Sequence, residues 1–193
     1  MHRIQTFNAI SELGLEKLPK DNFDVGPNLT GADAILLRSF KLEAASITNP
    51  LKAVARAGAG VNNVPVGECT QKGVVVFNTP GANANAVKEL VLCGLLLGSR
   101  GVIPGIGFAT SQENVTDYSE LSKLVEAEKK RFKGNEIAGK TLGVVGLGAI
   151  GSMVADMAIK LGMKVQGFDP ALSVDAAWRL PSEVKRIENL STL

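Results

Sequence analysis

The sequence predicts an α/β protein built on parallel sheets. Short runs that are apolar on both faces alternate with segments of helical periodicity, which is the pattern of buried strands covered by helices. Hydrophobic residues make up 45% of the 193 residues and charged residues 21%, so the chain can bury a core and is not disordered. The length corresponds to one large domain or two small ones.

Charge and cysteine content exclude several classes of function. The formal net charge of +2, from 21 basic and 19 acidic residues, is too small to indicate a nucleic-acid partner. Cys69 and Cys93 lack the spacing of metal ligands, so we expect free thiols in a reducing compartment and no metal. The longest apolar run, Leu90 to Leu97, is far shorter than the ~20 residues of a membrane span. We therefore expect a cytoplasmic protein that binds neither nucleic acid nor a membrane.

The first part of the chain predicts a small α/β domain that ends near residue 80. Three apolar runs bounded by Gly, Pro, Asn or Asp are typical of buried strands, namely Ala34–Leu37, Ala53–Ala55 and Val74–Phe77. The segments around Asn8–Leu18 and Val66–Lys72 fit short covering helices.

A long apolar helix and a boundary are expected next. The segment Ala86–Leu97 is apolar nearly all round, which indicates a helix buried between two domains or subunits. Gly and Pro punctuate residues 99–107, which indicates a domain boundary. Thr116–Phe132 predicts a further helix that ends in Lys129-Lys130-Arg131. Cations in a last turn suit the helix dipole, and a merely solvated basic end is an equal alternative.

The last part of the chain predicts strands and a helix in the order of a nucleotide-binding unit. Leu142–Leu147 fits a strand, Ala149–Leu161 an amphipathic helix, Val165–Phe168 a second strand and Val184–Ile187 a weak third.

A glycine motif lies between the first of these strands and its helix. Gly146, Gly148 and Gly151 have the spacing of the dinucleotide fingerprint, in which the glycines permit a tight turn, backbone approach to a pyrophosphate, and close packing of helix on strand. We expect Gly146, Gly148, Ala149, Ile150 and Gly151 to form the cofactor site, since the unpaired N–H groups of a helix N-terminus bind anions. The alternative is a glycine-rich turn without a ligand.

An acidic residue follows at the place that the same fingerprint requires. Asp169 ends the next strand, where a carboxylate accepts hydrogen bonds from an adenosine ribose and repels a 2′-phosphate. The sequence therefore predicts NAD rather than NADP.

Three segments resemble the D-isomer-specific 2-hydroxyacid dehydrogenase family. They are Arg56–Val64, Phe77–Glu89, and the Gly146–Gly151 motif with Asp169. Within the family the chain is most similar to the phosphoglycerate dehydrogenase group. The resemblance implies a flavodoxin-like substrate domain over residues 1–98, including a helix that crosses to the other domain. It further implies the first half of a Rossmann NAD-binding domain over residues 99–193, and a homodimer or homotetramer.

The resemblance also assigns substrate contacts. In the Arg56–Val61 loop, Gly58 and Gly60 allow backbone N–H groups to face an anion, although an ordinary turn is the alternative. The family uses this loop for the substrate carboxylate, which implies roles for Gly58, Ala59, Gly60 and Val61.

Basic and cofactor-facing positions complete the site that the resemblance implies. Arg38, Ser39, Arg56 and Lys129 match positions that contact a substrate phosphate, with Lys129 supplied by a neighbouring subunit. Ala59 lies near the cofactor, and Val87 either lies under the nicotinamide or only packs its helix.

No catalytic base is expected within these residues. Oxidation of a secondary alcohol needs a base for the hydroxyl proton, and the sole histidine, His2, precedes the first predicted strand and has no motif around it. The family's arginine, glutamate and histidine are expected after Leu193, so we interpret the chain as the first part of a longer enzyme.

The resemblance implies NAD-dependent oxidation of D-3-phosphoglycerate to 3-phosphohydroxypyruvate in serine biosynthesis. A glyoxylate or hydroxypyruvate reductase and a non-catalytic NAD-binding module are the alternatives.

Overall fold

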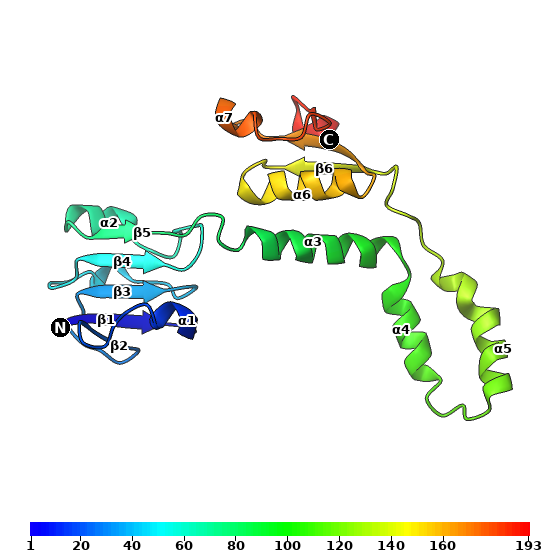
Figure 1. The fold of residues 1–193 in the computed structure, drawn as a ribbon, viewed down its shortest axis with the longest axis horizontal. Helices are drawn as coiled ribbons and strands as arrows, with labels where there is room; N and C mark the ends of the chain where they lie inside the picture. Colours follow the sequence, from blue (N-terminus) through cyan, green and yellow to red (C-terminus); the bar gives the residue numbers. More distant parts are fainter. The chain divides into compact units, whose positions relative to one another are not determined.

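The chain forms two compact units in the computed structural model, which describes residues 1–193 (Figure 1). The first unit spans Met1–Asn83 and the second Ala84–Leu193. The long apolar helix, which the expected first domain of residues 1–98 includes, packs with the second unit.

The first unit contains a parallel sheet in the order β2-β1-β3-β4-β5, the order of flavodoxin-like folds. Every neighbouring pair is parallel, so all five strands end at the same edge. This confirms the α/β class. The strands are β1 (His2–Phe7), β2 (Phe23–Gly26), β3 (Ala34–Leu37), β4 (Ala53–Arg56) and β5 (Val75–Phe77).

Two strands of this sheet are absent from the sequence prediction. In β1 the polar residues Arg3 and Gln5 alternate with the buried Ile4 and Thr6, so the strand is not a continuous apolar run. β2 is only four residues long and contains an aspartate and a glycine. His2, expected before the first strand, is the first residue of β1.

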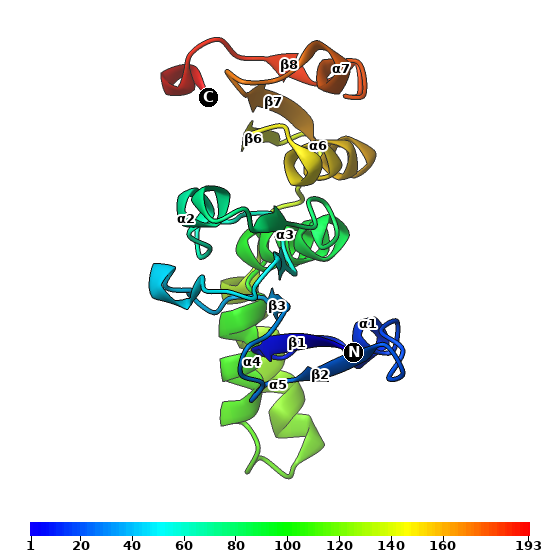
Figure 2. The same ribbon diagram turned by 90° about the vertical axis from the view of Figure 1, so that its left-hand side faces the viewer.

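Short helices connect these strands. They are α1 (Glu12–Leu15), the 3₁₀ turn η1 (Ala44–Ser46) and α2 (Val66–Gln71), and Figure 2 shows α1 and α2 on opposite faces of the sheet. The helix expected over Asn8–Leu18 is thus reduced to one turn. Asn8 adopts φ +65°, outside helical geometry, and Gly14 weakens helix propensity. The core of the unit comprises Ile35, Leu37, Leu42, Ile47, Val54, Val64, Cys69 and Val74.

The second unit contains a parallel sheet in the order β6-β7-β8. Its strands are β6 (Thr141–Val145), β7 (Lys164–Phe168) and β8 (Lys185–Arg186), and its helical segments around the sheet are α6 (Ala149–Lys160), α7 (Val174–Ala177) and η3 (Leu190–Thr192). The core consists of Val144, Leu147, Val154, Ala155, Ala158, Met163 and Val165. The strand–turn–helix–strand order expected around Gly146 is confirmed.

The remaining helices of this unit are α3 (Ala84–Ser99), α4 (Val102–Ser111), α5 (Tyr118–Glu128) and the 3₁₀ turn η2 (Lys129–Phe132). Val91 and Leu95 of α3 pack against the core of the second unit. No single helix is long and apolar enough to cross a membrane; α3 and α4 meet that criterion only as a pair bent by 67°, by length and composition.

The segment expected as a boundary at residues 99–107 is mostly helix α4. Pro104 is tolerated because it lies in the first turn, where its missing N–H would have no helical partner. Gly101 and Gly134 allow the backbone before α4 and the backbone around the end of η2 to approach each other closely. A Cβ atom on Gly101 would lie 2.6 Å from the Phe132 carbonyl oxygen, and one on Gly134 would lie 2.2 Å from that of Ser99.

Candidate functional site

The turn between β6 and α6 is shaped by glycine. Gly146 has φ +87°, a conformation that L side chains rarely adopt. A Cβ atom on Gly151 would lie 1.8 Å from the carbonyl oxygen of Gly146, so only glycine fits there. A Cβ atom on Gly148 would meet nothing within 4 Å, which leaves open space above the turn.

The N-terminus of α6 is open to an anion. Gly148 is its N-cap and no side chain caps the helix, whereas Asp117 caps α5 and Ser173 caps α7. The amides of Gly148, Ala149, Ile150 and Gly151 therefore make no hydrogen bond within the chain. Unpaired amides and the positive end of the helix dipole favour a phosphate at this position.

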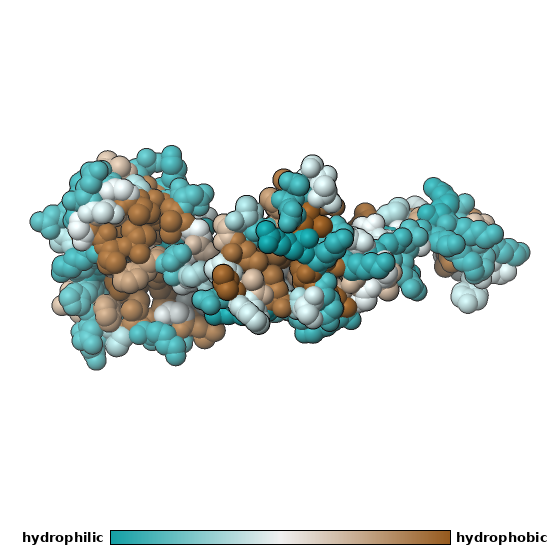
Figure 3. Space-filling model, turned by 90° about the horizontal axis from the view of Figure 1, so that it is seen from above, coloured by the Kyte–Doolittle hydropathy of each residue, from teal (hydrophilic) through white to brown (hydrophobic).

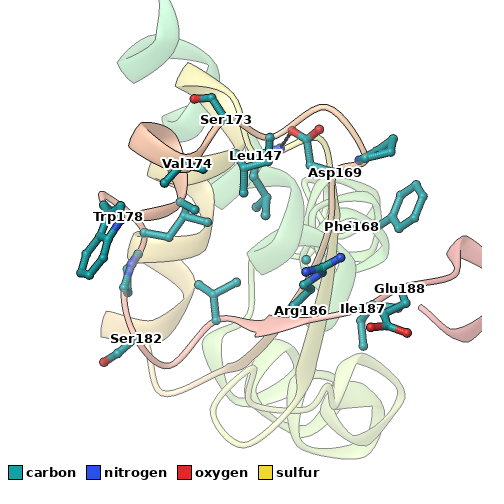
Figure 4. A pocket seen from close by; sticks show the side chains of 17 residues that line it. Leu147, Phe168, Asp169, Ser173, Val174, Trp178, Ser182, Arg186, Ile187 and Glu188 are labelled. Carbon is teal, nitrogen blue, oxygen red and sulfur yellow. Dashed lines mark hydrogen bonds between the residues drawn. The ribbon is translucent and has the colours of Figure 1, made fainter.

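Asp169 follows β7 and braces this turn. Its Oδ2 accepts from the N–H of Leu147 at 2.8 Å (Figure 4). Its Oδ1 accepts from the N–H of Ala171 at 3.0 Å. The first bond links the carboxyl ends of β6 and β7. Each carboxylate oxygen has a second lone pair, so the group can still accept a ligand hydroxyl.

A cavity of about 1010 Å³ lies beside Asp169 within the second unit. Figure 4 shows Asp169 on one side of it and Trp178 on the other. Trp178 is 84% exposed at the rim. Leu147, Leu172, Val184 and Ile187 contribute apolar lining, so the space suits a flat apolar ring next to a hydroxyl-bearing group.

The first unit gathers its predicted residues at the carboxyl edge of the sheet. Arg38 and Ser39 follow β3, and Arg56 ends β4. Arg56 Nε donates to the carbonyl oxygen of Arg38 at 3.1 Å. A Cβ atom on Gly58 would lie 2.6 Å from Arg56 Nη1, so the guanidinium lies against the glycine-rich loop.

The loop after Arg56 presents free amides. The N–H groups of Ala59, Gly60 and Val61 make no hydrogen bond within the chain. Two residues beyond β5 support the loop from behind. Asn78 Nδ2 donates to the Ala59 carbonyl at 2.7 Å, and the N–H of Thr79 donates to the Gly58 carbonyl at 2.9 Å. Cations and free amides together make this edge suitable for an anionic ligand.

Two asparagines that sequence reasoning missed bind the turn after β3. Asn8 Oδ1 accepts from the amides of Ser39 at 3.0 Å and Phe40 at 2.6 Å. Asn63 Nδ2 donates to the carbonyls of Arg38 at 3.1 Å and Phe40 at 2.7 Å. Their partners lie more than twenty residues away in the sequence, so no local pattern marks them.

The other predicted residues lie in the second unit. Val87 is half-buried in α3. Lys129 begins η2, where its ammonium pairs with Glu126 and is 55% exposed.

His2 lies at the edge of the first sheet opposite to Arg38 and Arg56. Its Nδ1 is 3.9 Å from Asp33 at the amino end of the strands. A backbone hydrogen bond from Arg3, followed by one from Lys52, lowers the pKa of Asp33 below its ordinary value. His2 therefore belongs to a charged cluster and not to the anion site.

This chain resembles curated proteins that are longer than it is. It is 36% identical over 149 residues to the D-3-phosphoglycerate dehydrogenase of Methanocaldococcus jannaschii, which covers 76% of the chain and 26% of that protein. It is also 36% identical over 163 residues to the hydroxypyruvate reductase of Thermotoga maritima, covering 83% of the chain and 48% of that protein. The chain thus spans between about a quarter and a half of these relatives.

Solved structures share the fold. An NAD+-bound 3-phosphoglycerate dehydrogenase of Entamoeba histolytica matches with a TM-score of 0.67 at 24% identity, over 97% of this chain and 57% of that one. A 2-hydroxyacid dehydrogenase of Ketogulonicigenium vulgare matches with a TM-score of 0.75 at 22% identity, over 100% of this chain and 61% of that one. The model of the D-isomer specific 2-hydroxyacid dehydrogenase catalytic domain matches residues 3–177. The chain therefore belongs to the D-isomer specific 2-hydroxyacid dehydrogenase family.

Proposed function

We propose that this chain is the substrate- and NAD-recognising part of an enzyme that oxidises D-3-phosphoglycerate to 3-phosphohydroxypyruvate, the reaction that begins serine biosynthesis from this substrate. The observation that carries the proposal is the uncapped N-terminus of α6 behind a turn that only glycine can form, with the Asp169 carboxylate at its side. This arrangement suits a pyrophosphate with an adjacent ribose diol.

NAD is the proposed cofactor. Gly148, Ala149, Ile150 and Gly151 would hold its pyrophosphate through their free backbone amides, and Asp169 would accept from its ribose. Gly146, whose own N–H donates to the Phe168 carbonyl at 2.8 Å, would contribute the shape of the turn. The bound cofactor supplies a nicotinamide ring that accepts hydride. Ala59 and Val87 are proposed to lie close to that ring, on the basis of the family resemblance.

The substrate is assigned by the charge at the carboxyl edge of the first sheet. The free amides of Ala59, Gly60 and Val61 would bind the carboxylate that all 2-hydroxy acids share. Arg38 and Arg56, with Ser39 and Gly58, provide a second anionic subsite, which a phosphorylated substrate needs and an unphosphorylated one does not. Lys129 of a second copy is proposed to join this subsite.

Reduction of hydroxypyruvate is the second candidate, favoured by the Thermotoga maritima relative. The complete enzyme distinguishes the two when Arg38→Glu and Arg56→Glu are each introduced. We expect both changes to lower kcat/KM for 3-phosphoglycerate by at least about tenfold, since a hydrogen bond to a charged group contributes about 1.5–3 kcal/mol. Equal or greater losses with hydroxypyruvate would overturn the phosphorylated substrate.

The hydroxyl proton needs a base that these residues do not offer, and we propose that the family's arginine, glutamate and histidine lie outside them. Residues 1–193 alone should therefore show no turnover when NADH is followed at 340 nm with NAD and 3-phosphoglycerate. Loss of a general base alone costs about 10²–10⁴-fold. Turnover within tenfold of the complete enzyme would place the catalytic groups inside this chain, and no turnover by either would leave NAD binding as the function.

A homodimer or homotetramer is proposed from the apolar surface of α3 and α4. Leu90 is 72% exposed, Ile103 59% and Ile106 57%, although Figure 3 shows the tip of the α4–α5 region, on the right, as mainly hydrophilic. Exposed apolar residues of this kind mark interfaces. Ile106→Lys should shift the complete enzyme toward monomer in sedimentation at micromolar concentration, and a monomeric wild type would contradict the assembly.

A further inference from the structure

We propose that Asn8 and Asn63 are positioning residues for the anion site of the first unit. They hold the Arg38–Phe40 turn from both sides and thereby fix the Arg38 carbonyl, to which the Arg56 guanidinium is bonded. The inference rests on the proposed function, because it names what sets the affinity of the same site for a phosphorylated acid.

Asn8 holds the amide side of the turn. It follows β1 and has φ +65°, a left-handed conformation that asparagine tolerates better than most residues. Its Oδ1 accepts from Ser39 and Phe40. The Phe7 ring stacks on the Phe40 ring with centroids 4.2 Å apart and planes 10° apart, which fixes the same turn a second time. β1 is therefore coupled to the residues that follow β3.

Asn63 holds the carbonyl side. Its Nδ2 donates to Arg38 and Phe40, and its own carbonyl accepts from the N–H of Leu42 at 2.9 Å. Because the carbonyl oxygens of Arg38 and Phe40 can only accept hydrogen bonds, the side-chain nitrogen of Asn63 must face them and not its oxygen. Asn63 Oδ1 is buried without a partner, an arrangement that costs stability. The side chain is thus placed for its two donated bonds, and the accepting oxygen is left unused.

Arg56 depends on the same carbonyl. The Arg38 oxygen receives both Asn63 Nδ2 and Arg56 Nε, at 3.1 Å each. With Nε held there, the Nη groups lie over the glycine-rich loop, where the free amides of Ala59 to Val61 also face outward. Displacement of this carbonyl would release the guanidinium from the loop.

Two substitutions with the same charge separate this role from simple electrostatics. A carboxylate accepts hydrogen bonds and cannot donate them. Asn8→Asp therefore keeps both accepted bonds, whereas Asn63→Asp loses both donated bonds and faces two carbonyl oxygens. Both variants add one negative charge beside the same turn. Asn8→Ala removes the accepted bonds without adding charge.

The test is an NMR titration of the 193-residue chain with 3-phosphoglycerate, following the backbone amides of Gly58–Val61 and the Arg56 Nε–H resonance, with thermal unfolding measured in parallel. We expect Asn63→Asp to weaken binding at least tenfold more than Asn8→Asp and to shift the Arg56 Nε–H resonance. Asn8→Ala should also weaken binding, and Asn8→Asp should restore the Ser39 and Phe40 amide shifts.

The outcomes distinguish the inference from the proposed function. Binding of equal strength by the wild type and all variants would overturn the positioning roles and leave the substrate assignment intact. Absence of binding by the wild type would overturn the substrate assignment itself, and the positioning roles with it. If Asn63→Asp unfolds, the comparison of Asn8→Ala with Asn8→Asp decides, and equal affinity of those two would overturn the inference.

Discussion

The two glycine-rich turns of this molecule are built by different physical means. In the second unit the backbone makes the site: Gly146 needs a positive φ, Gly151 has no room for a Cβ atom, and the free amides belong to the first turn of α6. In the first unit side chains make the site. Gly58 and Gly60 have ordinary φ values, and a Cβ atom on Gly58 would meet only the flexible end of Arg56.

The difference explains why the geometry of one site can be predicted from sequence, whereas the side chains that support the other cannot. A steric requirement for glycine leaves a fixed spacing between a strand and a helix, which is readable without any relative. The loop of the first unit is held by Asn78 and Thr79, and the neighbouring Arg38–Phe40 turn is held by Asn8 and Asn63. Both depend on residues that the sheet brings together, and the glycines of the loop are only permissive. A substitution of an obligatory glycine in the second unit should therefore abolish cofactor binding. Substitutions of the supporting side chains in the first unit should each lower ligand affinity only in part.

The largest effect should come from Gly151→Ala. The new methyl group would collide with the Gly146 carbonyl at 1.8 Å, so the turn or the start of α6 must move. We expect the free energy of unfolding of the second unit to fall by about 3 kcal/mol, the upper range of overpacking costs, and NAD binding to be lost. Urea unfolding followed by circular dichroism measures the first, and calorimetric titration of the complete enzyme the second.

Gly148→Ala is the matched control, because its methyl group would enter open space at an ordinary φ of −70°. It should leave the unfolding midpoint unchanged while lowering NAD affinity, since the methyl group occupies the space that a pyrophosphate needs. Equal destabilisation by both alanines would show that the turn is not sterically determined.

Asp169→Ala should have the next largest effect, on binding rather than folding. The change removes an acceptor for a ribose hydroxyl and releases the N–H of Leu147 from its 2.8 Å bond. NAD affinity should fall about 10- to 100-fold, as for loss of a hydrogen bond to a charged group. NADP affinity should fall less, because the repulsion of a 2′-phosphate disappears together with the brace.

Asp169→Asn is the matched control for the charge. Its single carbonyl oxygen can keep the bond to Leu147 and lose only the one to Ala171, so the turn should stay braced. Tighter binding of NADP than of NAD by the unaltered enzyme would contradict the role given to this carboxylate.

The sequence predicted elements best where apolar residues are consecutive or where a glycine is sterically required. The strands β3, β4 and β5 and the turn before α6 could be inferred because apolar runs and obligatory glycines are local. β1 alternates polar and buried residues, so it has no apolar run that would indicate a strand. Gly101 and Pro104 at the start of α4 are typical of a turn, so the composition of that segment did not indicate a helix. The roles of Asn8 and Asn63 could not be inferred, because their partners exist only once β1, β3 and β4 are aligned.

The smallest expected effect is a pH dependence of stability, which arises from Asp33 at the amino edge of the first sheet. Side chains thus determine the properties of this unit at both edges of its sheet. Asp33 accepts from the Arg3 amide at 3.0 Å and from Lys52 Nζ at 3.1 Å, and these two bonds lower its pKa in the folded chain. A carboxyl group whose folded pKa is lowered stabilises the fold above its unfolded pKa, which is 3.8 for Asp33. That contribution is lost as the pH falls through the lower, folded value.

Asp33→Asn should therefore destabilise the chain at pH 7. Its effect should become progressively smaller below pH 3.8, where the carboxyl of the unfolded chain takes up its proton first, and should vanish below the lower pKa of the folded chain. The measurement is the urea midpoint of both forms between pH 7 and pH 2.5. Lys52→Gln should reduce the same pH dependence in part, because the bond from Arg3, the larger cause, remains. A difference between wild type and Asp33→Asn that stays constant or grows as the pH falls would show that Asp33 contributes through packing and not through its charge.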